Sequence, residues 1–340
     1  MKYLIIGPSW VGDMVMAQSL FILIKQRDPD AEIDVLAPAW SRPIVSRMPE
    51  VRGMLDMPVG HGQVSLGVRY RLAKSLRANG YDQAIVLPNS LKSALIPWLA
   101  KVPVRTGWRG EMRYGLLNDL RVLDKEALPL MVQRFDALAF AQGEPLPATL
   151  PNPRLTVDEA NQREALQRFQ LTTDRPVIAM CPGAEFGEAK RWPAEHYAEL
   201  AKRRIEAGSQ VWLFGSAKDQ PVGEAIIAAL PESARAQVTN LAGRTSLADA
   251  VDLLALAQAV ISNDSGLMHV AAALQRPLVV LYGSTSPGFT PPLADQVRSL
   301  RLGLDCSPCF KRDCPLGHLK CLKDLSPVMA DRALVELLGN

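Results

Sequence analysis

The sequence lacks several features that would assign it to a class at once. No apolar run reaches the length of about 18 residues that a membrane-spanning helix needs. The net charge is small, +3 from 38 basic and 35 acidic residues, which is untypical of nucleic-acid-binding proteins, so we expect no nucleic-acid partner. No signal peptide precedes the strand-like segment that starts near Met1, and we therefore expect a cytoplasmic protein.

Two common nucleotide-binding motifs are also absent. No G-x-G-x-x-G follows any predicted strand, which argues strongly against an NAD-dependent dehydrogenase. Gly7 and Gly12 have the spacing of a P-loop, but Asp13 occupies the position at which that motif needs lysine. Because a carboxylate there would repel phosphate, we exclude a P-loop nucleotide-binding site.

Buried strands and amphipathic helices alternate along the chain, which predicts βαβ units and parallel sheets. The alternation stops at the proline-rich stretch 145–153, a stiff connector, and then starts again. We therefore predict an α/β fold with domains over residues 1–150 and 151–325 and a C-terminal helical segment over 326–340. The predicted strands are residues 3–6, 33–37, 54–57, 84–87, 177–181, 210–214, 259–262 and 277–282. The predicted helices are residues 14–27, 41–48, 66–79, 90–101, 129–142, 193–207, 222–230, 246–258 and 326–338.

The stretch 260–274 begins as a buried strand, turns at residues 263–266 and continues as an alanine-rich helix. A helix N-terminus presents unpaired N–H groups and a partial positive charge, which suits a phosphate. Asp264 or Ser265 can cap this helix, and His269 lies on the same face as Ser265 by its i,i+4 spacing. The simpler alternative is an ordinary turn with a structural cap.

Three more loops of the second half follow predicted strands or precede helices, at residues 182–193, 214–219 and 241–246. In the first, Lys190 suits a phosphate as a point charge, and Arg191 can bind one bidentately. Taken alone, these cations are explained equally well as solvated surface charge. All four loops gather at one edge of a parallel sheet, however, and this convergence favours a nucleotide site.

Asp13 is the acidic residue of the first glycine-bearing loop. One hypothesis makes it a general base that faces a cleft between the two domains. The alternative is an N-cap, which is a common role for aspartate. The helix N-terminus favours the charged carboxylate and so lowers its basicity, and other groups would have to compensate for this effect.

The first half also contains cations interleaved with aromatic residues, which is a composition suited to an anionic glycan. The alternative is a solvated face with a few core aromatics. The cations are Lys92, Arg105, Arg109 and Arg113, and the aromatics are Trp98, Trp108 and Tyr114.

Four cysteines lie within sixteen residues in a C-x2-C-x4-C-x6-C pattern, with His318 inside it. In a cytoplasmic chain such a cluster indicates a structural zinc site sooner than disulfides, but a loop of unligated thiols stays open as the alternative. The four are Cys306, Cys309, Cys314 and Cys321. Cys181 is expected to be a single core thiol.

Four segments together resemble glycosyltransferase family 9, the ADP-heptose:lipopolysaccharide heptosyltransferases. They are residues 7–14, 106–119, 183–193 and 263–269, and the similarity covers about the first 300 residues. The resemblance implies a GT-B fold, in which two Rossmann-like domains face each other across a cleft. It also implies that the first domain binds the acceptor and the second binds the nucleotide sugar.

The resemblance implies an inverting transfer of heptose from ADP-heptose to the first heptose of the Kdo–lipid A inner core. The acceptor, heptosyl-Kdo2–lipid A, implies work at the cytoplasmic face of the inner membrane, with peripheral association as an expectation. No cofactor is expected for catalysis. Family members that act at another inner-core position are the alternative.

The resemblance also implies roles for individual residues. Asp13 matches the position of the catalytic base. The positions implied for nucleotide-sugar binding are Ala184, Glu185, Lys190, Asp219, Thr245, Asp264, Ser265, Gly266 and His269. The positions assigned to acceptor binding are Ser9, Trp10, Lys92, Arg105, Arg109 and Arg113.

Two other function classes remain as alternatives. A metal-dependent GT-A transferase would have a D-x-D at the end of a strand. The D-x-D in this chain, at Asp28 and Asp30, lies at a helix–strand turn, where turn chemistry explains it better. A non-catalytic sugar-binding module would bind ADP without turnover.

Overall fold

The computed structural model describes residues 1–60 and 63–339 and divides the chain into two units, Met1–Leu155 and Thr156–Asn340. The proline-rich stretch 145–153 has no regular secondary structure and lies just before this boundary, which the sequence predicted at residue 150. Residue 340, the last of the predicted C-terminal segment, lies outside the described residues. Within the described ranges, no helix is both long and apolar enough to cross a bilayer.

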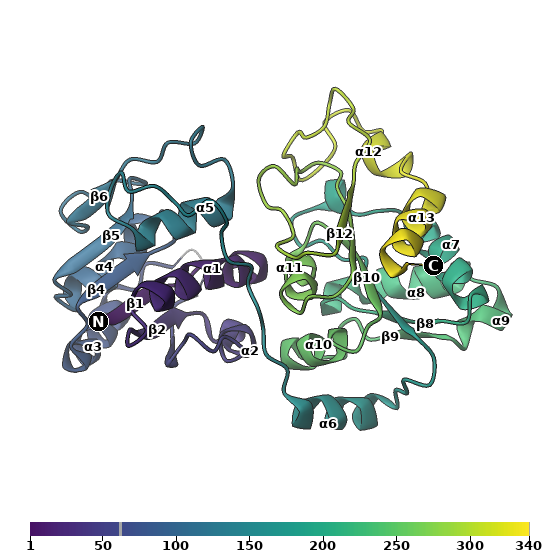
Figure 1. Cartoon of the computed structure of the whole chain (residues 1–340), viewed down its shortest axis with the longest axis horizontal. Helices are drawn as coiled ribbons and strands as arrows, with labels where there is room; N and C mark the ends of the chain where they lie inside the picture. Colours follow the sequence, from purple (N-terminus) through teal and green to yellow (C-terminus); the bar gives the residue numbers. More distant parts are fainter. Residues whose placement is uncertain (61–62, 340) are drawn as a thin grey trace. The chain divides into compact units, whose positions relative to one another are not determined.

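The first unit is built on a six-stranded parallel sheet with the order β3-β2-β1-β4-β5-β6 (Figure 1). This is the order of a Rossmann fold, and it reverses direction between β1 and β4. The strands are β1 Lys2–Ile6, β2 Glu32–Ala37, β3 Gly53–Asp56, β4 Gln83–Val86, β5 Val104–Trp108 and β6 Asp119–Arg121. The α-helices are α1 Val11–Arg27, α2 Arg42–Val45, α3 Leu66–Leu76, α4 Leu91–Leu99 and α5 Met131–Asp136.

The second unit repeats this topology, with the order β12-β11-β10-β7-β8-β9 and the reversal between β7 and β10. Its strands are β7 Val177–Cys181, β8 Gln210–Leu213, β9 Val238–Asn240, β10 Ala259–Asn263, β11 Leu278–Leu281 and β12 Val297–Leu300. Its helices are α6 Glu159–Phe169, α7 Ala194–Glu206, α8 Gln220–Ala229, α9 Glu232–Arg235, α10 Leu247–Leu254, α11 Gly266–Ala273, α12 Lys320–Lys323 and α13 Pro327–Leu338. Two parallel sheets of this order confirm the predicted pair of Rossmann-like domains.

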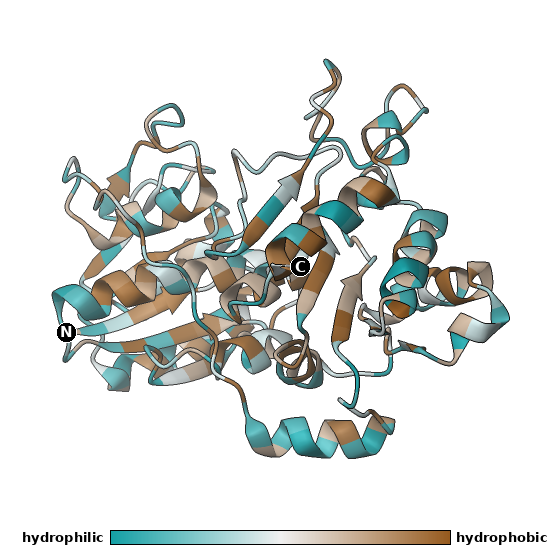
Figure 2. Ribbon diagram, turned by 45° about the vertical axis from the view of Figure 1, so that its right-hand side comes forward, coloured by the Kyte–Doolittle hydropathy of each residue, from teal (hydrophilic) through white to brown (hydrophobic). Residues whose placement is uncertain are grey.

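The sequence analysis missed the strands β5, β6, β9 and β12 and the helices α6, α9 and α12, and two of these show one reason. β12 lies at a sheet edge and carries the exposed residues Arg298 and Ser299, so it has no apolar run. In α6 the only buried residue is Ala165, and bands of teal mark this helix in Figure 2, whereas the central strands are brown. Apolar periodicity finds elements that bury a face, and these two bury little.

Helix α1 begins at Val11, three residues earlier than predicted. Its N-cap is Trp10, whose carbonyl accepts a hydrogen bond from the N–H of Met14 at 2.9 Å. Asp13 therefore lies inside the first helical turn, and the alternative that made it the N-cap is wrong. A carboxylate in the first turn is still stabilised by the helix dipole.

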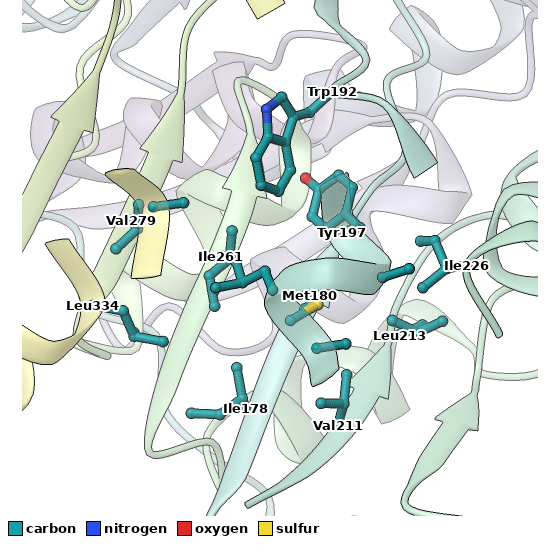
Figure 3. Packing of buried hydrophobic residues seen from close by; sticks show 14 of the residues in the cluster. Ile178, Met180, Trp192, Tyr197, Val211, Leu213, Ile226, Ile261, Val279 and Leu334 are labelled. Atoms are coloured by element: carbon teal, nitrogen blue, oxygen red, sulfur yellow. The ribbon is translucent and has the colours of Figure 1, made fainter. Parts of the chain in front are cut away.

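The core of the second unit gathers around Trp192 and Tyr197, which Figure 3 shows beside Ile261 of β10. The two rings pack edge to face with centroids 4.9 Å apart, and both are fully buried. The indole N–H of Trp192 donates to the carbonyl of Leu325 at 2.8 Å, which ties the chain before α13 to this core. Figure 1 shows α13, in yellow, beside α7 of the same unit.

Asp136 is a fully buried carboxyl group on α5, the helix that packs against α1. The hydroxyl of Ser19 on α1 donates to its Oδ2 at 2.8 Å, and its Oδ1 has no hydrogen-bond partner in the part of the chain that the structure describes. Burial raises the pKa of Asp136 to about 8, although the hydrogen bond from Ser19 acts in the opposite direction. The side chain is therefore protonated in the folded protein at neutral pH.

We expect this carboxyl group to make the stability of the protein fall as pH rises. In the unfolded chain an aspartate ionises near pH 4, whereas folded Asp136 keeps its proton until about pH 8. Its contribution is complete below the unfolded pKa and is lost as pH rises through the folded one. The loss is on the order of a few kcal/mol over this window. Asp136→Asn cannot ionise and should lack this slope.

The measurement is urea unfolding of both proteins at pH 5 and pH 8. The unfolding free energy of Asp136→Asn should rise relative to wild type between these two values. Asp30→Asn, at an exposed turn, is the matched control and should keep the wild-type slope. Equal slopes for wild type and Asp136→Asn would show that Asp136 is ionised in the folded protein.

Candidate functional site

The second sheet reverses its strand order between β7 and β10, and the loops after these two strands meet there. Asn263, the last residue of β10, joins them. Its amide nitrogen donates to the carbonyl of Pro182 at 2.7 Å. Its amide oxygen accepts from the N–H of Trp192 at 3.2 Å and from the hydroxyl of Tyr197 at 3.1 Å. In open α/β sheets this is the position at which ligands bind.

Lys190 and Asp264 form an ion pair across this point, with Nζ 2.7 Å from Oδ2. Their side chains are only 14% and 4% exposed, so the pair is screened little by water. The hydroxyl of Thr285, in the loop after β11, donates to the same Oδ2 at 2.5 Å. Lys190 also donates to the carbonyl of Asp264 at 3.3 Å. The contacts hold the ammonium group just before the start of α11.

Helix α11 starts at Gly266 with Ser265 as its N-cap, and the side chain of Ser265 makes no capping hydrogen bond. Asp264 does not cap the helix either, because its carboxylate contacts Lys190 and Thr285 instead. Ser265 therefore occupies the predicted N-cap position, but its hydroxyl makes no capping hydrogen bond to the first turn. Within residues 1–60 and 63–339, no side chain accepts a hydrogen bond from the N–H groups of the first turn. Together with Lys190, these groups suit an anion such as phosphate.

His269 lies one turn into α11 and is 4% exposed. Its pKa is lowered to about 4, mainly by burial; the carboxylate of Asp264 opposes this shift, and the positive charge of Lys190 adds to it. The ring is therefore neutral at physiological pH. Its Nδ1 is buried and has no hydrogen-bond partner among the described residues, so the ring keeps hydrogen-bonding capacity beside the ion pair.

Asp219 shapes the loops around this site. Its carboxylate accepts from the N–H and the hydroxyl of Ser216, at 2.9 and 2.8 Å. It also lies so close to Gly183 that a Cβ there would come within 2.4 Å of the carboxylate. A Cβ at Gly215 would lie 2.7 Å from the Cβ of Asp219, so the two glycines are required by close packing rather than by turn geometry.

The other residues implied for the nucleotide sugar have varied surroundings. Ala184 is buried, and Glu185 is exposed and paired with Lys218. Thr245 is half-buried, and its hydroxyl donates to the carbonyl of Leu241 at 3.3 Å. The structure thus brings together the Lys190–Asp264 ion pair, the start of α11 and His269. The polar contacts of Glu185 and Thr245 are made with other residues.

In the first unit the loop after β1 leads directly into α1, at the point where that sheet reverses its order. Asp13 is half-buried in the first turn of α1, and Ser9 and Trp10 are exposed just before it. Gly7 packs tightly, because a Cβ there would lie 2.8 Å from the terminal methyl of Met14. The sequence between strand and helix therefore presents Asp13 at the carboxyl edge of the sheet.

Arg113, predicted to contact an acceptor, is only 1% exposed. Its guanidinium donates to the carbonyls of Pro88 and Trp108, at 2.6 and 2.5 Å, and to the side chain of Asn89 at 3.2 Å. It therefore supports the loop between β4 and α4 from below the surface. Burial lowers its pKa to about 10, so it stays charged at neutral pH.

Arg105 also differs from the prediction. It lies near the amino end of β5, away from the edge that carries Asp13, and donates to the carbonyls of Leu116 and Val102 at 2.6 Å each. It fixes the loop that returns to β6. Of the predicted acceptor cations, Arg109 is exposed and Lys92 half-buried, so these two are better placed to meet a ligand.

The four cysteines of the C-terminal cluster are free thiols in the segment that follows β12, and each is half-buried. Burial raises the pKa of the Cys321 thiol, and the neighbouring thiols at 314, 306 and 309 raise it further, which indicates that the four lie near one another. Across residues 1–60 and 63–339, however, no three His, Cys, Asp or Glu side chains are grouped closely enough to hold a metal ion. The zinc site stays a prediction.

Sequence reasoning missed two residues that build the site. Thr285 lies in the loop after β11. The sequence analysis could have included it, because it looks for ligand contacts in the loops that follow strands. Asn263 was assigned to the turn, but its hydrogen bonds to two loops and to the aromatic core could not be read from sequence.

Comparison with known proteins agrees with this geometry. A family model described as "Glycosyltransferase family 9 (heptosyltransferase)" matches residues 69–320 of this chain. The chain belongs to glycosyltransferase family 9. It is 56% identical to lipopolysaccharide heptosyltransferase 2 of Salmonella typhimurium, over 100% of this chain and 99% of the relative. A solved structure of ADP-heptose LPS heptosyltransferase II from Escherichia coli matches with a TM-score of 0.89 and 52% identity, over 99% of this chain and 98% of that one.

Lipopolysaccharide heptosyltransferase 1 of Pseudomonas aeruginosa is more distant, at 27% identity over 99% of this chain and 91% of the relative. The predicted GT-B fold is confirmed, and so is the predicted resemblance to glycosyltransferase family 9. The comparisons and the geometry agree that the chain is a glycosyltransferase.

Proposed function

We propose that the protein transfers L-glycero-D-manno-heptose from ADP-heptose to the first heptose of the Kdo–lipid A inner core, in lipopolysaccharide core synthesis. The observation that carries the donor class is the buried Lys190–Asp264 pair beside the uncapped N-terminus of α11. Fixed positive charge at a strand-order reversal suits a nucleoside diphosphate. The names of the relatives at more than 50% identity support heptose as the sugar.

The donor would lie in the second unit with its diphosphate at Lys190 and the first N–H groups of α11. These groups are fixed before the reaction and face the negative charge that develops on the departing ADP. A divalent metal ion is therefore not needed for that role. Neutral His269, with its free Nδ1, offers a further hydrogen bond to the donor.

Asp13 would act as the base. The acceptor hydroxyl oxygen attacks the anomeric carbon, and the bond from that carbon to the diphosphate oxygen breaks. ADP leaves with the electron pair, and the hydroxyl proton moves to the Asp13 carboxylate. A single displacement of this kind inverts the anomeric configuration.

The acceptor would be bound by the first unit through Ser9, Trp10, Lys92 and Arg109. Trp10 is 51% exposed, and an exposed indole suits stacking on a sugar ring. The proposed acceptor is a lipid-linked sugar, so the protein would work at the cytoplasmic face of the inner membrane.

The direct test is a transfer assay with purified protein, ADP-heptose and inner-core acceptors that carry zero, one or two heptoses. Transfer should occur to the one-heptose acceptor, with one ADP released per sugar. Transfer to the acceptor without heptose, or to the one with two, would assign the chain to another inner-core position. Binding of ADP-heptose without transfer to any acceptor would indicate a sugar-binding module.

The same assay tests the role of metal ions. Initial rates should be unchanged in mild EDTA, and a complete loss restored by magnesium would contradict a metal-free mechanism. Slow unfolding in EDTA, with release of one zinc ion, would instead support structural zinc at the four cysteines.

Asp13→Asn tests the base. Asparagine keeps the size of the side chain but cannot take the proton, so kcat should fall by roughly 10²–10⁴-fold with ADP-heptose still bound. The helix loses only a first-turn charge, which is a small effect of about 0.3–1 kcal/mol. The measurements are kcat and the melting temperature.

Glu159→Gln, at the exposed first turn of α6, is the matched control for a lost helix-start charge. It should leave kcat unchanged. A folded Asp13→Asn protein that binds the donor and turns over within a few-fold of wild type would leave Asp13 only a helix-stabilising role.

A further inference from the structure

The segment 304–314, between β12 and α12, contacts the loops of the proposed donor site through its backbone. The N–H of Phe310 donates to the carbonyl of Ser284 at 2.7 Å, and the carbonyl of Arg312 accepts from the N–H of Ala189 at 3.0 Å. The N–H of Ser284 in turn donates to the carbonyl of Ala189 at 3.2 Å. Ala189 and Ser284 directly precede Lys190 and Thr285 in sequence, and both of these bind Asp264. The segment is therefore hydrogen-bonded to the two loops that supply the partners of Asp264.

The approach at Arg312 leaves no room for a side chain on the facing loop. A Cβ at Gly187 would lie 2.4 Å from the carbonyl oxygen of Arg312. Glycine at this position therefore lets the two backbones meet, and the contact fixes where the Arg312 side chain begins.

That side chain lies beside the same ring as Lys190. The guanidinium carbon of Arg312 is 5.4 Å from the centroid of Phe186, and Nζ of Lys190 is 5.0 Å from it. Both cations therefore lie against the ring of one residue in the loop after β7.

The cations around this loop differ in whether they already have a carboxylate partner. Lys190 is paired with Asp264, Arg191 with Asp219 and Lys218 with Glu185. Arg312 forms no ion pair with any carboxylate in the described part of the chain, and it is exposed. Its positive charge is therefore available to a ligand, and a guanidinium binds phosphate oxygens bidentately.

We propose that Arg312 is a second cationic ligand of the donor diphosphate, placed next to Lys190 by the backbone of the segment 304–314. The inference rests on the proposed function and deepens its donor site. It also gives a function to the segment that carries three of the four cysteines. This segment is distant from the loop after β7 in sequence but would supply a second phosphate contact beside it.

The test is calorimetry of ADP and of adenosine with wild type, Arg312→Gln, Arg312→Lys and Lys311→Gln. Loss of one charge-assisted contact at an exposed site should weaken ADP binding by about tenfold in Arg312→Gln and leave adenosine binding unchanged. Arg312→Lys keeps the charge but lacks the planar guanidinium group, so its ADP affinity should lie between those of wild type and Arg312→Gln. Lys311→Gln removes the neighbouring exposed cation and should bind ADP as wild type does.

The segment is held by backbone contacts, so all three variants should keep the wild-type melting temperature. Equal ADP affinity in Arg312→Gln and wild type would overturn this inference and leave the proposed function intact. Equal weakening of ADP and adenosine would also overturn it, because that pattern indicates a disturbed loop. A wild-type protein that does not bind ADP would overturn the proposed function together with this inference.

Discussion

The second unit depends on a buried ion pair. Lys190 and Asp264 come from loops 74 residues apart, and their side chains meet where water has little access. Each charge would be costly to bury without the other, so both loops must be placed together. Thr285 and Asn263 add hydrogen bonds that hold the carboxylate and the backbone around it. The result is an ammonium group that is fixed beside the start of α11 before any ligand arrives.

The parallel sheet explains why so many distant residues converge. In both units the strand order reverses once, and the loops on either side of the reversal leave the sheet at the same edge. The second unit uses that edge for the ion pair and the helix start, and the first unit uses it for Asp13. Burial lowers the pKa of both His269 and Arg113, to about 4 and about 10. His269 is therefore neutral at physiological pH, whereas Arg113 stays charged while it supports a loop from inside.

The sequence predicts those structural elements and site residues that leave a local pattern in the chain. Strand 177–181 was predicted with its observed bounds because all five residues are apolar or small and fully buried. Edge strand β12 and helix α6 bury little and leave no periodic signal. Lys190, Asp264 and His269 were found because they lie in strand-end loops or next to one. Arg312 was missed, and Arg113 was assigned to the surface, because only the tertiary fold determines which arginines meet carbonyls and which remain available.

The most direct test of the central electrostatic claim is ADP calorimetry on Lys190→Ala and on the double variant Lys190→Ala with Asp264→Asn. The single variant leaves Asp264 buried without its cation, and the double variant removes that charge as well, so the double variant should regain stability. Both should bind ADP about 10- to 100-fold more weakly than wild type, a loss of roughly 1.5–3 kcal/mol. Lys202→Ala, an exposed cation on α7, should bind ADP normally. Unchanged ADP affinity in the folded double variant would contradict the account.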